Sequence, residues 1–432
     1  MPDGTRFAGH ETAARPTRGY VLHPDMKADR TRRLPEHGLD EAVALAGALP
    51  GLTVTGAEVV RVARANPATL LRSGKVADLK ARFAELDVEL VLVDGSVTPV
   101  QQRNLEKEWG VKLLDRTGLI LEIFADRART REGVMQVELA ALSYQRTRLV
   151  RAWTHLERQR GGFGFVGGPG ETQIESDRRA IDDQVIRIKR QLDRVVKTRE
   201  LHRAARRKVP FPVVALVGYT NAGKSTLFNR MTGADVLAKD MLFATLDPTM
   251  RGVTLPSGRK IIASDTVGFI SDLPTQLVAA FRATLEEVLE ADLICHVRDI
   301  SHPESAEQAA DVRDIMTSLG VRATVPVIEV WNKLDLVTGT ARDALILQSA
   351  ARDEVQAVSA LTGDGIDTLL ARISRAFEEE KSDAVLLLPF DQGRRRAWLH
   401  GHDVVTAEQT GDDGWQISVR WTARQAAEWA AA

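Results

Sequence analysis

A glycine-rich segment behind a buried strand constrains the fold of this chain more than any other feature. The residues GYTNAGKS, 218–225, follow the apolar run VPFPVVALVG and precede a helical pattern. A Walker A loop requires this order of strand, loop and helix, because its amides converge on phosphate at a helix N-terminus. The segment therefore predicts a phosphate-binding loop in a doubly wound α/β domain.

The side chains of this loop have separate expected roles. Lys224 is placed to reach the β and γ oxygens of a nucleoside triphosphate, and the Ser225 hydroxyl to coordinate Mg²⁺. The residues expected to contact the nucleotide here are Gly218, Tyr219, Thr220, Asn221, Ala222, Gly223, Lys224, Ser225 and Thr226.

A second motif, ASDTVG at 263–268, ends the next strand-like run. We expect Asp265 to bind in the magnesium shell and the Gly268 N–H to meet the γ-phosphate and sense its loss. Between the two motifs lies LFATLDPTM, where a threonine would close over magnesium and γ-phosphate in the triphosphate state. Thr245 is our choice and Thr249 the alternative. The predicted metal ligands are thus Ser225, Thr245 and Asp265, and the predicted catalytic residues are Lys224, Thr245 and Gly268.

Two further motifs select the base. NKLD at 332–335 follows the strand-like run VPVIEVW, and SALTG at 359–363 follows VQAV. The Asp335 carboxylate can accept from guanine N1–H and the exocyclic amine, a pair of donors that adenine does not present. Lys333 would stack over the base, and the backbone near Ala360 would donate to the guanine oxygen. Asn332, Lys333, Asp335, Ser359, Ala360 and Leu361 complete the predicted site, which binds GTP and GDP.

Phe269 stands directly after DTVG, where many nucleotide hydrolases carry the glutamine that orients the attacking water. A phenylalanine cannot do so. We therefore predict slow GTP hydrolysis by the isolated chain, accelerated when a partner orders the loops or supplies a missing group. Alternatively Phe269 fills an apolar pocket, but the glutamine is absent in either case.

Changes in sequence pattern divide the chain into five parts. Residues 1–18 are polar and predict a flexible arm, and the alternating apolar and amphipathic runs of 19–129 predict a small α/β domain. Residues 130–208 predict an antiparallel helical hairpin, 209–380 the P-loop GTPase domain, and 381–432 a small β appendage. The fold class is therefore α/β.

The predicted hairpin carries two apolar stripes at helical spacing and a glycine-rich tip. Residues 161–170 hold six glycines, and residues 146–208 contain 17 Lys/Arg against eight Asp/Glu. The simplest interpretation of this basic excess is a charged helix face exposed to solvent. Because the basic excess flanks a projecting tip, we favour contact with RNA. The expected contacts are Gly161, Gly162, Phe163, Gly164, Phe165, Gly167, Gly168, Arg178 and Arg179.

Composition limits the remaining classes. The 432 residues are 44% hydrophobic, which indicates two to four domains, and 58 basic against 59 acidic residues leave no bulk charge to attract nucleic acid. A single cysteine, Cys295, excludes an internal disulfide and a thiolate metal cluster. We find no signal peptide or run of about 18 apolar residues, so we expect a cytoplasmic protein without a membrane span. Nothing in the sequence demands more than a monomer.

Several segments together resemble the HflX family of ribosome-associated GTPases, a group of translation-factor-related P-loop GTPases. Besides the four nucleotide motifs, the resemblance rests on VLHPDMK, TPVQQRNLE, LLDRTGLILEIFADRARTREGVMQVELAALSY and GPGETQIESDRR. It covers nearly the whole chain. It implies a linker tip that reaches the large ribosomal subunit near the peptidyl transferase centre, and GTP-dependent splitting or rescue of stalled ribosomes. Potassium-activated relatives of this fold also carry an asparagine where Asn221 stands, which implies K⁺ beside Mg²⁺; a loop-stabilising asparagine is the alternative.

Other functions share parts of this pattern. An RNA-binding or ribosome-assembly module, in which GTP sets conformation without splitting, would carry the same motifs. A tRNA-modification or iron-transport GTPase would also need a modification domain or membrane spans. The SGK at 73–75 is a fragment of phosphate-loop chemistry, so either it binds a second nucleotide or it forms an ordinary turn.

Overall fold

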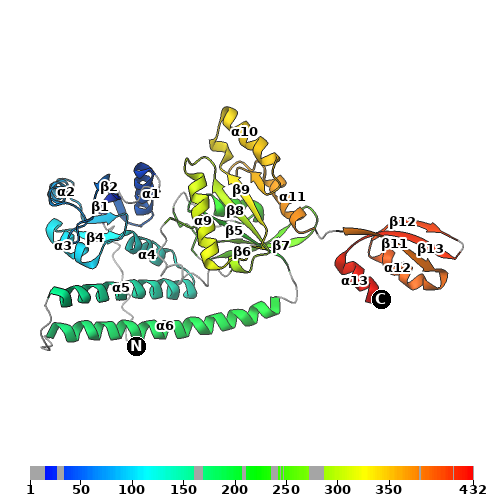
Figure 1. The fold of residues 1–432 in the computed structure, drawn as a ribbon, viewed down its shortest axis with the longest axis horizontal. Helices are drawn as coiled ribbons and strands as arrows, with labels where there is room; N and C mark the ends of the chain where they lie inside the picture. Colours follow the sequence, from blue (N-terminus) through cyan, green and yellow to red (C-terminus); the bar gives the residue numbers. More distant parts are fainter. Residues whose placement is uncertain are drawn as a thin grey trace, which may run out of the picture. The chain divides into compact units, whose positions relative to one another are not determined.

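The computed structural model describes residues 15–26, 34–159, 169–206, 211–234, 242–243, 245–246, 248–271, 287–378, 381–411 and 413–431. They form two compact units, Met1–Leu369 and Leu370–Ala432 (Figure 1). The first unit holds three substructures: an N-terminal α/β domain, a helical hairpin and the P-loop domain, whose last helix begins in this unit and ends in the second. The predicted α/β class is confirmed.

The N-terminal α/β domain is built on a four-stranded parallel sheet in the order β2-β1-β3-β4. Its elements are β1 Thr17–Met26, α1 Pro35–Gly47, β2 Leu52–Val62, α2 Ser73–Glu85, β3 Leu90–Val93, α3 Pro99–Trp109, β4 Lys112–Asp115 and α4 Arg116–Arg127. Local signals set the ends of α3, which starts in a capping box between Thr98 and Gln101 and stops at Gly110 with φ +73°. The SGK segment is the first turn of α2, where Lys75 pairs with Glu58 at 3.0 Å.

The predicted hairpin consists of α5 Arg131–Gln159 and α6 Pro169–Arg206, which run side by side in opposite directions (Figure 1). Where side chains are described, the predicted apolar stripes form the seam: Met135, Leu139 and Leu142 of α5 pack with Ile181, Val185, Ile188, Leu192 and Val195 of α6. Arg146 and Asp182 form a salt bridge of 2.8 Å between the two helices. The glycine-rich tip lies outside the described residues.

The P-loop domain has a six-stranded sheet in the order β10-β9-β8-β5-β7-β6. All its neighbours pair in parallel except β6 and β7. Its elements are β5 Val213–Gly218, α7 Lys224–Thr232, β6 Thr249–Thr254, β7 Lys260–Asp265, β8 Leu293–Asp299, α9 Ser305–Leu319, β9 Val327–Asn332, η1 Leu334–Leu336, α10 Gly339–Ala350, β10 Val355–Ala357 and α11 Ile366–Ala376. Because the central strands are buried on both faces, they are largely apolar: β5 reads VVALVG, and β8 begins with Leu293, Ile294 and Cys295. Their carboxyl ends meet at one edge, where the nucleotide motifs follow them.

The second unit contains an antiparallel sheet in the order β11-β13-β12. Its elements are β11 Lys381–Pro389, η2 Phe390–Gln392, α12 Gly393–Gly401, β12 Val405–Thr410, β13 Gly414–Thr422 and α13 Ala423–Ala431. The predicted C-terminal strands are present, and the structure adds α12 and α13. Leu399 of α12 and Trp429 of α13 are buried with Ile417, Val419 and Trp421 of β13. Among the described helices, none is long and apolar enough to cross a membrane.

Candidate nucleotide-binding site

The phosphate-binding loop connects β5 to α7 through a backbone that tolerates few substitutions. Gly223 has φ +88° and Asn221 has φ +58°, the left-handed conformation that glycine and asparagine adopt most readily. A Cβ atom on Gly218 would lie 2.1 Å from the carbonyl oxygen of Val297 on the neighbouring strand. The glycines are thus needed for the turn and for close approach of the loop to β8.

Lys224 is buried at the start of α7, and its ammonium group donates to the carbonyl oxygens of Gly218 at 3.1 Å and Tyr219 at 2.8 Å. Burial lowers the pKa of Lys224 to about 8, and the nearby charge of Asp265 only partly offsets this. A phosphate at this position would stabilise the charged form directly. The lysine is therefore held within reach of the loop that is expected to cradle the phosphates.

Three oxygen-bearing side chains converge beside Lys224. The Ser225 hydroxyl donates to Asp265 Oδ2 at 2.7 Å, the Thr245 hydroxyl donates to the same oxygen at 3.1 Å, and the two hydroxyls are 2.8 Å apart. Asp265 Oδ1 is buried, with no hydrogen-bond partner among the described residues. Burial raises the pKa of Asp265, so a cation here would stabilise its ionised form. Oxygen ligands with one carboxylate suit Mg²⁺, which takes its other ligands from phosphate and water.

The structure separates the two candidate threonines. Thr245 lies in the cluster with Ser225 and Asp265, whereas Thr249 is the first residue of β6, opposite Asp265 in the sheet. Thr249 is thus part of the edge strand β6. The geometry thus favours Thr245 as the hydroxyl that joins the metal site.

Gly268 and Phe269 pack directly on the phosphate-binding loop. A Cβ atom on Gly268 would lie 2.9 Å from Thr220 Cα and 3.1 Å from Lys224 Nζ. Phe269 continues this contact through its backbone, because Thr220 N donates to its carbonyl at 2.7 Å and its own N–H donates to the Gly218 carbonyl at 3.1 Å. The Phe269 side chain is 0% exposed and belongs to a buried apolar cluster that also contains Val267. Its ring fills core space.

The base-recognition motifs meet the phosphate loop through Asn332. Its amide donates to the Ala222 carbonyl at 2.8 Å, and its amide oxygen accepts from Ala360 N at 2.9 Å. The Ser359 hydroxyl donates to Asp335 Oδ1 at 2.6 Å and orients that carboxylate. Asn332 thus fixes the distance between the phosphate loop and the loop predicted to receive guanine.

Other contacts complete this end of the site. Lys333 has φ +64°, and its ammonium group forms a salt bridge of 2.8 Å with Asp299 at the end of β8. Leu361 is exposed, next to Ala360. Arg230 of α7 donates to the carbonyls of Ala360, at 3.2 Å, and Leu361. The sequence analysis did not identify Arg230, because its partners lie about 130 residues further along the chain.

The predicted RNA contacts are only partly described. Gly161, Gly162, Phe163, Gly164, Phe165, Gly167 and Gly168 lie outside the described residues. Arg178 and Arg179 lie on α6 with exposed side chains.

Comparison with known proteins places this architecture in a family. Residues 36–125 match the model of the GTP-binding GTPase N-terminal region, 127–206 the GTP-binding GTPase middle region, 213–333 the 50S ribosome-binding GTPase, and 344–431 the HflX C-terminal domain. The GTPase HflX of Magnetococcus marinus is 48% identical over 406 residues, which cover 93% of this chain and 92% of that protein. This chain belongs to the HflX family of GTPases.

This HflX-family chain is also similar to a second curated protein and to a solved structure. The GTPase HflX of Escherichia coli is 42% identical over 354 residues, covering 81% of each protein. A solved structure of a GTP-binding protein from Sulfolobus solfataricus in complex with GDP matches with a TM-score of 0.46 and 23% identity, over 83% of this chain and 98% of that one. The chain is a GTPase, which agrees with the four nucleotide motifs at one edge of the sheet.

Proposed function

We propose that this HflX-family GTPase binds the large ribosomal subunit through its helical hairpin and uses its GTP-bound state to split or rescue stalled ribosomes. Membership of the family supports the first part, since the model matched by residues 213–333 describes a 50S ribosome-binding GTPase. The exposed basic side chains of the hairpin support its role as the contact with ribosomal RNA.

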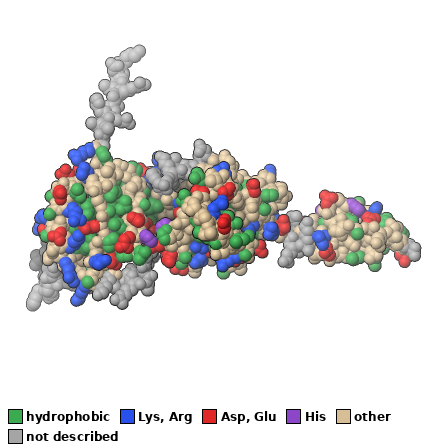
Figure 2. Space-filling view, turned by 90° about the horizontal axis from the view of Figure 1, so that it is seen from above, with side chains coloured by type: hydrophobic (Ala, Val, Ile, Leu, Met, Phe, Trp, Pro, Cys, Tyr) green, Lys and Arg blue, Asp and Glu red, His purple; other side chains and the backbone are tan. Residues whose placement is uncertain are grey.

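The exposed basic side chains of α6 carry this proposal. Exposed basic side chains recur along it at Arg178, Arg179, Arg187, Lys189, Arg190 and Arg194. On the face of the molecule in Figure 2, basic and acidic side chains are interspersed, in keeping with the formal net charge of −1. Affinity for RNA must therefore come from a local element, and phosphate contacts from Lys and Arg supply most of the sequence-independent binding.

The site residues divide the work of hydrolysis. Ser225, Thr245 and Asp265 would hold Mg²⁺, which when bound neutralises charge on the β and γ oxygens. Lys224 adds a positive charge, and the Gly268 N–H adds a donor at the γ-phosphate. The exposed Asn221 is the residue proposed to help bind K⁺, which would act beside Mg²⁺.

One group is missing from this set. The Phe269 side chain is buried and cannot orient the attacking water, so the chain alone turns over slowly. We propose that the ribosome supplies or orders the missing element, and that the chain acts as a monomer.

Ribosome splitting can be measured directly by light scattering of intact 70S ribosomes mixed with the full chain and GMPPNP. We expect scattering to fall with the parent chain, and to fall several times more slowly with Arg178→Glu, because charge reversal repels RNA phosphate. The control is Arg322→Glu, which reverses an exposed charge in the P-loop domain. Constant scattering with the parent chain, at concentrations where it co-sediments with ribosomes, would contradict splitting.

That last outcome would favour a second function. In an RNA-binding or assembly module, GTP sets conformation without splitting. The buried Phe269 favours this alternative, since a slow intrinsic hydrolase keeps its GTP-bound conformation for long. Binding to isolated large subunits that depends on GTP, with intact ribosomes unaffected, would identify it.

A further inference from the structure

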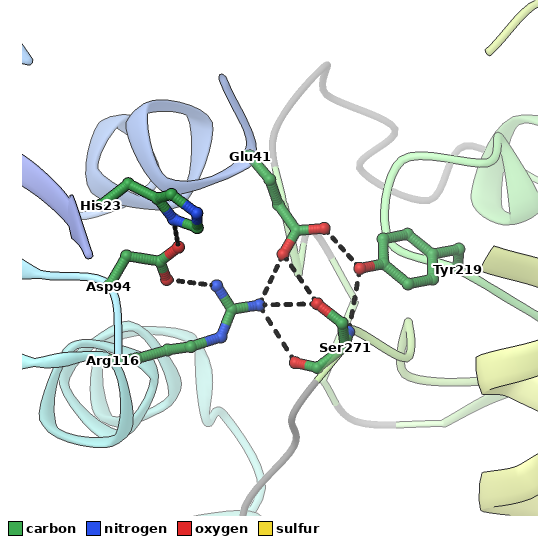
Figure 3. Close-up of polar contacts among 6 residues, drawn as sticks. All are labelled: His23, Glu41, Asp94, Arg116, Tyr219 and Ser271. Atoms are coloured by element: carbon green, nitrogen blue, oxygen red, sulfur yellow. Dashed lines mark hydrogen bonds and ion pairs between the residues drawn. The ribbon is translucent and has the colours of Figure 1, made fainter. Parts of the chain in front are cut away.

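A cluster of polar side chains joins the N-terminal α/β domain to the nucleotide site (Figure 3). At its centre is Arg116, the first residue of α4, whose side chain is only 9% exposed. Its guanidinium forms salt bridges with Asp94, which follows β3, and with Glu41 of α1. Because the donors of a guanidinium point in fixed directions, two carboxylates hold it in one orientation.

Arg116 also binds the segment that follows DTVGF. Its Nη2 donates to the Ser271 carbonyl at 3.0 Å and is 3.2 Å from the Ser271 hydroxyl. That hydroxyl donates to Glu41 at 3.1 Å, and the Ser271 N–H donates to the Tyr219 hydroxyl at 2.9 Å. The Tyr219 hydroxyl in turn donates to Glu41. Every polar group of Ser271 is thus tied either to the N-terminal domain or to the phosphate-binding loop.

The N-terminal side of this cluster is firmly built. His23 bonds Asp94 at 2.7 Å. Helix α1 packs so closely on His23 that a Cβ atom on Gly38 would lie 2.6 Å from the ring, which places Glu41 one turn later. Burial is the largest single effect and acts against the charges of Asp94 and Arg116, but their mutual attraction outweighs it together with the contacts to His23 and Glu41. The pKa of Asp94 is accordingly lowered and the pKa of Arg116 raised, so both stay charged.

The residue before Arg116 faces a different partner. Asp115 ends β4, and its carboxylate accepts from the Gly118 N–H at 2.8 Å and from the Tyr144 hydroxyl of α5 at 2.6 Å. Arg148, also on α5, donates to the same carboxylate at 3.2 Å. Two residues joined by one rigid peptide bond thus hold the first hairpin helix on one side and the segment after Phe269 on the other.

We propose that Arg116 is a positioning residue for binding of the γ-phosphate of GTP, and that the Asp115–Arg116 junction couples the nucleotide state to the position of α5. Gly268 lies three residues before Ser271 and packs on Lys224. Movement of Gly268 toward a γ-phosphate would therefore be transmitted to Ser271 and, through its bonds, to Arg116. Any such coupling acts equally in both directions, so displacing α5 would change the affinity for GTP.

Nucleotide affinities of the full chain test the positioning role. A held Ser271 reduces the ordering that γ-phosphate binding requires, and GDP lacks that phosphate. We expect Arg116→Gln to weaken GMPPNP binding about fivefold or more, while GDP affinity stays within about twofold. Arg116→Lys, which keeps the charge, should recover part of the loss. The control is Arg82→Gln, whose arginine pairs with Glu58 inside the N-terminal domain. Equal changes for both nucleotides, or no change, would overturn the proposal.

A probe on α5 tests the coupling. Cys295 is buried and its burial raises the pKa of its thiol to about 12, so a cysteine introduced at the exposed Gln145 can be labelled selectively. We expect the fluorescence of the labelled Gln145→Cys chain to differ between GDP and GMPPNP. The difference should fall by about half or more with Arg116→Gln and persist with Arg82→Gln.

A second, milder variant keeps the test valid if Arg116→Gln disturbs folding. Tyr144→Phe removes only the hydroxyl that bonds Asp115, and it should reduce the same fluorescence difference. The coupling would be overturned if the fluorescence were the same with GDP and GMPPNP, or if neither Arg116→Gln nor Tyr144→Phe reduced the difference between them. The coupling rests on GTP binding alone and no ribosome is present, so its failure is distinguishable from failure of the splitting proposal.

Discussion

Replacing Phe269 by glutamine tests whether a single substitution at this position can supply the side chain that orients the attacking water. The Phe269 side chain is fully buried in an apolar cluster next to the phosphate-binding loop. Removing a buried phenylalanine ring costs about 3 to 5 kcal/mol. A buried amide without a partner costs about 1 to 3 kcal/mol more, although the longer glutamine chain recovers part of the lost packing. We therefore expect Phe269→Gln to lose about 3 to 5 kcal/mol, against about 1 to 2 kcal/mol for the apolar control Phe269→Leu.

Two assays on the full chain measure the outcome. Urea unfolding without nucleotide, which avoids stabilisation by bound ligand, should show a lower midpoint for the glutamine variant. Single-turnover GTP hydrolysis should not accelerate, because the side chain at 269 faces the core rather than the γ-phosphate. A glutamine variant with parental stability and hydrolysis at least about tenfold faster would refute this reasoning. It would show that the side chain at 269 leaves the core when GTP binds.

Three other predictions concern different parts of the site. Asn332→Ala should lower stability by about 2 to 5 kcal/mol and weaken GDP binding, because it leaves the Ala222 carbonyl and the Ala360 N–H without their buried partner; denaturant midpoints and fluorescent-GDP titration would measure this, and unchanged values would contradict it. Burial lowers the pKa of His296 to about 4, so the unfolded chain binds more protons between pH 6.5 and 4 and stability should fall over that window by up to about 3 kcal/mol. His296→Leu should remove that part of the pH dependence, and a parental pH profile would exclude the assignment. If Asn221 helps to bind K⁺, hydrolysis should be faster in KCl than in NaCl of equal concentration, and Asn221→Ala should abolish the difference; equal turnover in the two salts would exclude potassium activation.

The sequence was most informative where each functional group directly follows a strand. Lys224, Asp265 and Asn332 all lie at or just after the carboxyl ends of parallel strands, and such ends meet at one edge of a sheet. Short-range motifs therefore sufficed to predict that these groups converge. The hairpin seam was equally accessible, because helical periodicity places Leu139 and Val185 on predictable faces.

Contacts between distant segments could not be predicted in this way. Arg116 binds Ser271 across 155 residues of sequence, and Glu41 binds Tyr219 across 178. Nothing local to either partner specifies such a pair. The edge strand β6, TMRGVT, is polar and contains a glycine, so it lacks the apolar run of its neighbours. Helix α12 is similarly short and rich in arginine, and its one fully buried side chain, Leu399, leaves little apolar periodicity to detect.

The rate of GTP hydrolysis with and without purified large ribosomal subunits, at fixed salt, tests the central claim most directly. The buried Phe269 side chain cannot orient the attacking water, and the exposed basic side chains of α6 offer a route to ribosomal RNA. The account predicts slow turnover alone and stimulation of about tenfold or more by the subunits. Fast turnover that the subunits do not change would contradict it, because the chain would then complete its own catalytic site.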